Sequence, residues 1–279
     1  MDLNTHFATY RNRTFIIESP SGRIFKYGQF AELVQKAAAL LHENECHKGD
    51  RVAVLFPNSV ELAAIYFACL QSGIIIVPIN AALSERGIRY IVESVQPTLI
   101  VFSICTRPIV TRTCGGVGRR QICVRTMAEK PFCREAIEVI DVVQDGLVAE
   151  EITQSPKNTP NASDLFVIYF TSGTTSQPKG VAHTGKNLIH AACAFADAVQ
   201  FSEQTRIYNV WPMSNSTGFL NTVLCPFVVG GSVLLSRPFD AQTVLDFWTP
   251  VIRHQATALW LSPSMMAAML RVDRDKKGV

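Results

Sequence analysis

The sequence predicts an α/β protein built of mostly parallel sheets that carry helices on both faces. Several short segments, such as residues 52–56 and 98–102, are apolar throughout, which is typical of strands that are buried on both sides. They alternate with stretches whose apolar residues follow helical spacing, as in helices that pack on a sheet. Alternation of this kind indicates βαβ crossovers and therefore parallel strands.

The chain opens with a predicted β-hairpin at residues 15–18 and 24–26, which flank the turn-forming group Ser19-Pro20-Ser21-Gly22. A helix is expected over residues 27–43, and Pro57-Asn58-Ser59 starts another that runs to about residue 71. Further strands are expected at 52–56, 74–78, 98–102, 164–170, 206–210, 232–235 and 258–261, with a short extended piece at 181–182. Further helices are expected at 84–94, 186–201, 219–229, 241–254 and 263–271.

The pattern weakens between residues 103 and 161, where basic side chains crowd together. They are Arg107, Arg112, Arg119, Arg120, Arg125, Lys130 and Arg134. A surface for single-stranded nucleic acid would interleave aromatic side chains for base stacking, a pattern that this region lacks. We expect a solvated, variable connecting region.

Composition narrows the classes of function. A net charge of +3 is too small to indicate a nucleic-acid partner. The two longest apolar stretches, residues 62–83 and 220–235, are interrupted by Pro78 and by Gly230-Gly231, so each predicts a buried helix followed by a strand rather than a transmembrane segment. The N-terminus has neither the basic start nor the apolar stretch of a signal peptide, and we expect a cytoplasmic protein.

The eight cysteines predict reduced thiols, since several lie inside apolar runs where cysteine acts as a small hydrophobic residue. The evenly spaced group at 105, 114, 123 and 133 leaves zinc as an alternative. This group has no two-residue spacing and no nearby histidine, however, so it lacks the usual pattern of zinc ligands.

A hydroxyl-rich loop follows the expected strand at 164–170, and it reads Thr171-Ser172-Gly173-Thr174-Thr175-Ser176-Gln177-Pro178-Lys179-Gly180. Binding of a polyphosphate needs several converging donors and a cation. This loop offers five hydroxyl groups, two glycines and Lys179. It is not a Walker A loop, because Pro178 precedes the lysine and Gly180 follows it. The alternative is a surface turn rich in Ser, Thr and Gly.

The loop resembles the phosphate loop of the adenylate-forming superfamily, which includes acyl- and aryl-CoA synthetases, adenylation domains of non-ribosomal peptide synthetases and beetle luciferases. Ser176 departs from the glycine that this family usually has. Other segments are similar in the same order along the chain: residues 25–30, 49–54, 71–80, 211–218 and 257–263. Among these enzymes, the acyl- and aryl-CoA synthetases have the segments that this sequence resembles most.

The resemblance implies that residues 1–279 form a partial AMP-binding domain. It would consist of a first βαβ portion at 1–102, the basic connecting region at 103–161, and a second α/β portion at 162–279 that starts with the phosphate loop. The downstream segments that bind adenine, ribose and Mg²⁺ in the family, and the C-terminal domain with its catalytic lysine, are not found in the sequence. No catalytic residue is therefore assigned within the chain, and the catalytic residues are expected downstream of Val279.

The resemblance also implies ATP-dependent activation of a small-molecule carboxylic acid as an acyl-adenylate, with Mg²⁺ and with CoA as the expected acceptor of the acyl group. The phosphates of ATP would lie against Thr171, Ser172, Gly173, Thr174, Thr175, Ser176, Lys179 and Gly180. Asn215 and Gly218 would border the acyl pocket, although Asn215 replaces the family's histidine and has a loop cap as its alternative role. Leu261, Met265 and Met266 fit an apolar pocket and core packing equally well.

Three hypotheses follow from the sequence. The chain is the N-terminal part of a carboxylate–CoA ligase that is inactive without a C-terminal portion supplied in cis or in trans. Alternatively, it is a short protein that binds a nucleotide or a partner without catalysis. The third possibility is a structural α/β module whose loop is vestigial.

Overall fold

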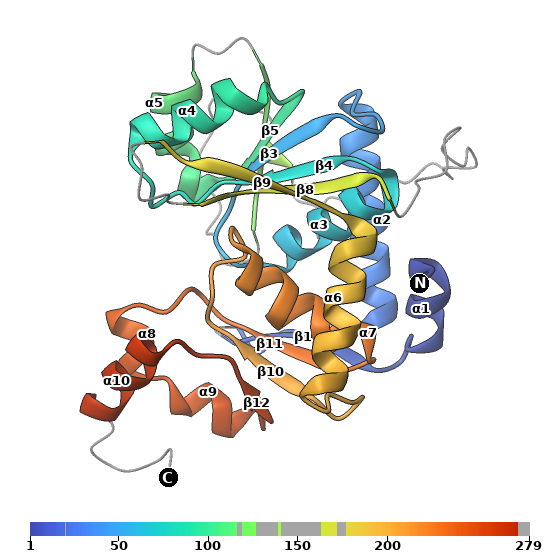
Figure 1. Ribbon diagram of the computed structural model, residues 1–279, viewed down its shortest axis with the longest axis vertical. Coiled ribbons are helices and arrows are strands. Elements are labelled where there is room, and N and C mark those ends of the chain that lie inside the picture. Colours follow the sequence, from blue (N-terminus) through green and yellow to red (C-terminus); the bar gives the residue numbers. More distant parts are fainter. Residues whose placement is uncertain (20, 116–118, 127–138, 141–162, 172–176, 273–279) are drawn as a thin grey trace.

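The computed structural model describes residues 1–19, 21–115, 119–126, 139–140, 163–171 and 177–272, and these residues form two mostly parallel sheets (Figure 1). The larger sheet has the order β7 (Val139–Ile140), β6 (Arg120–Val124), β5 (Leu99–Ser103), β3 (Arg51–Leu55), β4 (Ile75–Pro78), β8 (Leu165–Thr171) and β9 (Lys179–Thr184). All of its neighbouring strands are parallel except β8 and β9.

The smaller sheet has the order β12 (Ala258–Leu259), β10 (Arg206–Asn209), β11 (Ser232–Leu235), β1 (Thr14–Glu18) and β2 (Ile24–Lys26). Its strands are parallel except for the predicted hairpin of β1 and β2. The smaller sheet combines strands from both ends of the sequence, since β1 and β2 join β10, β11 and β12, whereas the larger sheet is built from the strands between them, β3 to β9.

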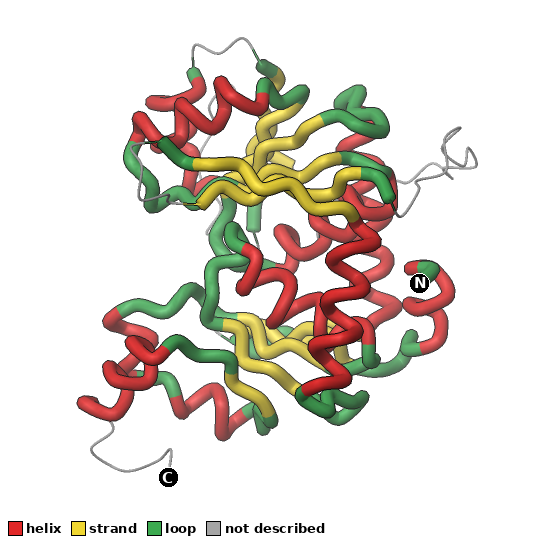
Figure 2. The backbone as a smooth tube through the Cα atoms, viewed as in Figure 1, coloured by secondary structure: helices red, strands yellow, loops and turns green. Residues whose placement is uncertain are grey.

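Helices fill the space between the two sheets and cover their outer faces, so the described residues form five layers (Figure 2). The central layer contains α2 (Tyr27–Glu43), α3 (Val60–Ser72), α6 (Gly185–Ala198) and α7 (Cys225–Val228). The outer layers contain α4 (Glu85–Val95) and α5 (Arg107–Cys114) on the larger sheet, and α8 (Ala241–Leu245), α9 (Trp248–Arg253) and α10 (Pro263–Val272) by the smaller one. The predicted α/β class, with helices on both faces, is confirmed.

Helix α3 explains why the two sheets share one core. All its residues from Val60 to Cys69 are buried, because one side faces β3 and β4 and the other faces the smaller sheet and α2. A helix that is apolar all round is stable only where every side is covered. Ser59 caps its N-terminus by accepting a hydrogen bond from the backbone N–H of Leu62 (3.1 Å), and Gly73 ends it in the left-handed conformation (φ 68°).

Two predicted helices differ from the structure, and a proline accounts for each difference. The helix expected at 219–229 is a π-helix, η2 (Thr217–Leu224), followed by α7. The ring of Pro226 would clash with the carbonyl four residues earlier, so the wider turn precedes it. The helix expected at 241–254 is divided into α8 and α9, because Pro250 cannot continue a hydrogen-bonded ladder back to Asp246.

Regular structure also occurs where the sequence pattern is weak or short. A helix, α1 (Leu3–Thr9), precedes the first hairpin, and a 3₁₀ turn, η1 (Ile104–Thr106), leads into α5. Strand β6 then pairs in parallel with β5, although it lies in the basic region. Strand β9 has six residues instead of the expected two, because it is the second strand of an antiparallel hairpin with β8.

Candidate functional site

The predicted phosphate loop is the connection of the β8–β9 hairpin. Thr171 at the end of β8 lies opposite Lys179 at the start of β9, and the Thr171 hydroxyl donates a long hydrogen bond to the Lys179 carbonyl (3.4 Å). Both residues are exposed at the open end of the hairpin. The intervening predicted residues, Ser172, Gly173, Thr174, Thr175 and Ser176, lie outside the described residues.

Gly180 lies directly behind this end of the hairpin, opposite Phe170. A Cβ atom at Gly180 would lie 3.1 Å from Cγ2 of Ile168 and 3.2 Å from Cζ of Phe170, which is tighter than ordinary contact. Glycine therefore lets β9 lie close against the side chains of β8. The hairpin thus brings one hydroxyl, one lysine ammonium group and a closely approached backbone to the same exposed end.

The second predicted segment, residues 211–218, leaves the end of β10 and enters η2. The buried side chain of Asn209 fixes both of its ends: Oδ1 accepts from the N–H of Trp211 (2.9 Å), and Nδ2 donates to the carbonyl of Gly218 (3.1 Å). The hydroxyl of Thr222 donates to the same Gly218 carbonyl (2.8 Å). The segment is therefore a fixed loop at the carboxyl end of a parallel strand, which is where α/β sheets commonly bind ligands.

Asn215 and Gly218 contact each other within this segment. The side chain of Asn215 is exposed, and its Oδ1 accepts from the N–H of Gly218 (3.3 Å). Gly218 is buried, and a Cβ atom there would lie 2.0 Å from the carbonyl oxygen of Pro212. Asn215 therefore satisfies one backbone N–H group near the start of η2, and glycine is required at position 218 by the close approach of the backbone. Their predicted place beside an acyl group stays a prediction.

Asn58, which the sequence placed only at a helix start, connects this loop to α3 and β11. Its Nδ2 donates to the carbonyls of Trp211 (2.8 Å) and Ser236 (2.9 Å), and its Oδ1 accepts from the N–H of Met213 (2.8 Å). Ser59 is the residue that caps α3. The sequence offered one sign of this role. A single side chain is enough to cap a helix, so the second polar residue beside Ser59 was available for other contacts.

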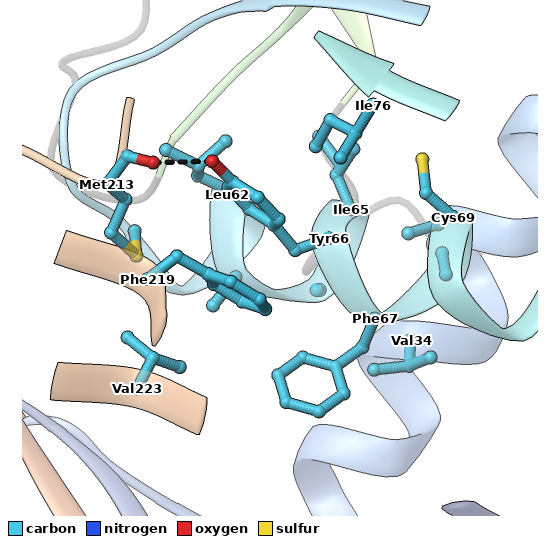
Figure 3. Packing of buried hydrophobic residues seen from close by; sticks show 14 of the residues in the cluster. Val34, Leu62, Ile65, Tyr66, Phe67, Cys69, Ile76, Met213, Phe219 and Val223 are labelled. Carbon is cyan, nitrogen blue, oxygen red and sulfur yellow. Dashed lines mark hydrogen bonds between the residues drawn. The ribbon is translucent and has the colours of Figure 1, made fainter. Parts of the chain in front are cut away.

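Buried aromatic residues link the same loop to α3 and to strand β8, and Figure 3 shows Tyr66 of α3 beside Met213 and Phe219. Tyr66 of α3 donates its hydroxyl to the carbonyl of Met213 (2.5 Å), and its ring stacks on Phe219 of η2 with centroids 4.0 Å apart. Burial raises the pKa of Tyr66 well above its ordinary value, and the neighbouring Tyr169 of β8 raises it further. Phe166, also on β8, packs edge-on to Tyr66. Tyr66 therefore contacts both the loop at 211–218 and strand β8, the strand that leads to the phosphate loop.

Other predicted features were tested among the residues that the structure describes. These residues contain no group of three or more His, Cys, Asp or Glu side chains that could hold a metal ion. Their cysteines form no disulfide; Cys133, a member of the group considered for zinc, lies outside them. No helix within the described ranges is long and apolar enough to cross a membrane.

Comparison with known proteins agrees with the resemblance. The sequence model of the family described as AMP-binding enzyme matches residues 3–278. A long-chain-fatty-acid–CoA ligase of Mycobacterium tuberculosis is 26% identical over 250 residues, which are 88% of this chain and 46% of that protein. A crotonobetaine/carnitine–CoA ligase of Salmonella paratyphi A is 28% identical over 266 residues, which are 94% of this chain and 50% of the ligase.

The chain thus spans about half the length of these curated relatives. Val279, after which the catalytic residues were expected, lies outside the described residues, as do all positions from 273 onwards. The expectation that catalytic residues follow Val279 is therefore not tested by the structure and stays a prediction.

Solved structures share the fold. An anthranilate–CoA ligase in complex with anthranoyl-AMP superimposes with a TM-score of 0.85 at 20% identity, covering 98% of this chain and 51% of the ligase chain. The ATP-bound protein MatB of Rhodopseudomonas palustris gives a TM-score of 0.78 at 21% identity, covering 98% of this chain and 52% of the other. At sequence identities of 20% and 21%, the structural similarity shows that the backbone fold is shared.

Proposed function

Because this chain belongs to the AMP-binding enzyme family, we propose that it is the ATP-binding part of an enzyme that activates a carboxylic acid. An oxygen of the acid attacks the α-phosphorus of ATP, the bond to the β-phosphate breaks, and acyl-AMP and pyrophosphate result. A thiol, which we propose to be that of CoA, then takes the acyl group and releases AMP. The relatives named as CoA ligases support this assignment.

The single observation that carries the proposal is the exposed end of the β8–β9 hairpin. Thr171 and Lys179 face each other there, on either side of a connection rich in hydroxyl groups. We assign the β- and γ-phosphates to this end, with the lysine offsetting part of their negative charge. Transfer at phosphorus depends mainly on positioning and charge neutralisation, which are the two contributions that such a hairpin makes.

The acyl group is assigned to the loop at 211–218, beside Asn215 and Gly218. What supports this is the fixed geometry of the loop and its contact, through Tyr66, with the helix that also packs against the phosphate hairpin. An asparagine beside the acid can donate or accept a hydrogen bond, but it cannot titrate. Acid binding at this position is therefore independent of the protonation of residue 215.

The described residues contain no set of side chains that could hold the expected Mg²⁺, so no step is assigned to the metal ion. Magnesium that accompanies a nucleotide is commonly held by phosphate oxygens, waters and one or two carboxylates. The remaining positive charge and the groups that orient the adenine are proposed to come from a further portion, in cis or in trans. On this proposal, the 279-residue chain binds ATP and adenylates poorly by itself.

Two measurements on the purified chain test the proposal. ATP should raise its melting temperature more than the same concentration of adenosine, because the phosphates supply the contact. Equal shifts with ATP and adenosine would favour a site that does not use the hairpin, and no shift with either would favour a structural module. Carboxylate-dependent exchange between ATP and pyrophosphate should be undetectable, and measurable exchange would contradict the assigned need for a further portion.

A further inference from the structure

A polar cavity lies at the amino ends of three parallel strands of the smaller sheet. Thr14 begins β1, Arg206 begins β10 and Ser232 begins β11. The cavity has a volume of about 260 Å³. Its lining residues are all polar, and they are Arg13, Thr14, Glu203, Gln204, Arg206 and Ser232. The loop at 211–218 follows the opposite, carboxyl end of β10, so the cavity is separate from that loop.

Arg13 is held in place by three contacts. Its Nε donates to the carbonyl of Gly230 (3.3 Å), and its Nη2 donates to the carbonyl of Glu203 (2.5 Å). Its Nη1 forms an ion pair with the carboxylate of Glu203 (3.0 Å). A guanidinium group has five N–H donors, so two of them remain for a further partner after these three contacts.

Arg206 is held in place from within the sheet and from the turn before β12. Its Nε donates to the hydroxyl of Ser232 (3.2 Å), and its Nη1 donates to the carbonyl of His254 (2.5 Å). The other three N–H groups of Arg206 make no hydrogen bond to the described residues. Because both arginines are fixed before a ligand arrives, little side-chain entropy is lost when one binds.

The cavity therefore has more positive charge and more donors than its own acceptors satisfy. Two guanidinium groups line it against one carboxylate, that of Glu203. The remaining N–H groups of the two arginines need acceptors, which water or an anion can supply. An anion gains more, since arginine binds the oxygens of phosphate and carboxylate through charge-assisted hydrogen bonds that are stronger than those to neutral acceptors.

We propose that this cavity binds a single phosphate group, as the free ion or at the end of a small phosphate ester. Its volume of about 260 Å³ is below the ~300–1,000 Å³ of pockets that hold drug-sized ligands, which excludes a whole nucleotide. None of the six lining residues is aromatic or apolar, so the cavity offers no contact for a base or an acyl chain. Two arginines from separate segments suit the oxygens of a tetrahedral phosphate, which point in several directions. The site does not depend on the β8–β9 hairpin, which belongs to the other sheet.

Thermal unfolding in sodium phosphate, compared with sodium chloride of equal ionic strength, tests this proposal. Phosphate also stabilises proteins in general because it is excluded from their surface, and that effect is common to all variants. Binding in the cavity adds a rise in melting temperature that follows a saturation curve, from which the dissociation constant is obtained. Arg206→Gln should raise this constant by at least about tenfold, because the charged donors are lost. Arg13→Gln should act likewise, and circular dichroism shows whether each variant is folded.

Glu203→Gln should change the affinity in the opposite direction. The carboxylate of Glu203 competes with a bound anion for Arg13, so its removal should lower the dissociation constant for phosphate. Arg86→Gln is the matched control for the loss of one positive charge. Arg86 is exposed on α4, which covers the larger sheet, so this variant should bind phosphate as the wild type does.

The same comparison in a Lys179→Ala background separates the cavity from the hairpin. A saturable rise that persists there and is lost with Arg206→Gln supports the cavity, whatever the outcome for ATP. A rise that Lys179→Ala abolishes would place the phosphate at the hairpin and overturn the proposal. The absence of any saturable rise in the wild type, or equal constants for the wild type and both arginine variants, would overturn it as well. Binding of glycerol 3-phosphate in addition to inorganic phosphate would show that the cavity accepts an ester, and binding of inorganic phosphate alone would identify the free ion as the ligand.

Discussion

Replacing Gly218 by alanine tests whether the loop at 211–218 depends on close backbone approach. The new Cβ atom would lie 2.0 Å from the carbonyl oxygen and 2.4 Å from the carbonyl carbon of Pro212. Ordinary van der Waals contact begins near 3.4 Å, so the oxygen and the Cβ must separate by a further 1.4 Å. Both atoms of Pro212 belong to the main chain, so no side-chain rotation can provide that space.

Moving the backbone at residue 218 away from Pro212 would also distort the hydrogen bonds that residue 218 makes. The carbonyl of Gly218 accepts from Asn209 and Thr222, and its N–H donates to Asn215. Each such bond contributes about 0.5–1.5 kcal/mol, and overpacking by itself costs typically ~1–3 kcal/mol. Gly218→Ala should therefore lower the free energy of unfolding by about 3 kcal/mol or more.

Urea unfolding followed by tryptophan fluorescence measures this effect, with Gly87→Ala as the control. Gly87 lies in α4, and its nearest neighbour to a new Cβ is the Ser84 hydroxyl at 3.4 Å, so alanine fits. Because alanine also favours a helix, the control should be neutral or more stable by up to ~1 kcal/mol. A Gly218→Ala midpoint within error of the wild type would refute the steric argument.

Three further predictions concern the rest of the fold. Tyr66→Phe leaves the buried Met213 carbonyl without its donor and should cost about 1–3 kcal/mol of unfolding free energy, measured by urea unfolding at constant m-value. Hydrogen bonds from Thr243 lower the pKa of Asp240, so the capping stability is present above the unfolded pKa and is lost as pH falls through the folded pKa; the melting temperature of Asp240→Asn should change less than that of the wild type on acidification. A thiol reagent should modify the exposed Cys105 and Cys193 at once. It should modify the buried thiols only after unfolding, and these are Cys46, Cys69, Cys114, Cys123 and Cys225.

The elements that the sequence predicted well are those whose signals are local. The bounds of α2 agree at both ends, because its apolar residues follow one face, and Ser59 was correctly included in the start of α3. The parallel strands were recognisable because both their faces are buried. Strand β9 was predicted too short, because it lies at an edge and most of its residues are exposed, so it lacks an apolar run.

Other features depend on contacts between distant parts of the chain. The assembly of β1 and β2 with β10, β11 and β12 joins residues about 200 positions apart, and no local pattern indicates it. Asn58 and Asn209 hold the loop at 211–218 through buried amide groups, and their importance arises only when the partners meet. Of the phosphate-loop prediction, the structure describes Thr171, Lys179 and Gly180, and it places the first two side by side.

The central claim is that the end of the β8–β9 hairpin binds the phosphates of ATP through Lys179. A calorimetric titration of ATP into the wild-type chain, Lys179→Ala and Lys186→Ala tests it most directly. Lys186 lies on α6, just after the hairpin, and it is exposed, so it controls for the loss of one positive charge in the neighbourhood. Loss of the Lys179 contact should raise the dissociation constant for ATP by at least about tenfold, or ~1.4 kcal/mol. The Lys186→Ala value should stay close to that of the wild type. Equal affinities for the wild type and Lys179→Ala would contradict the claim.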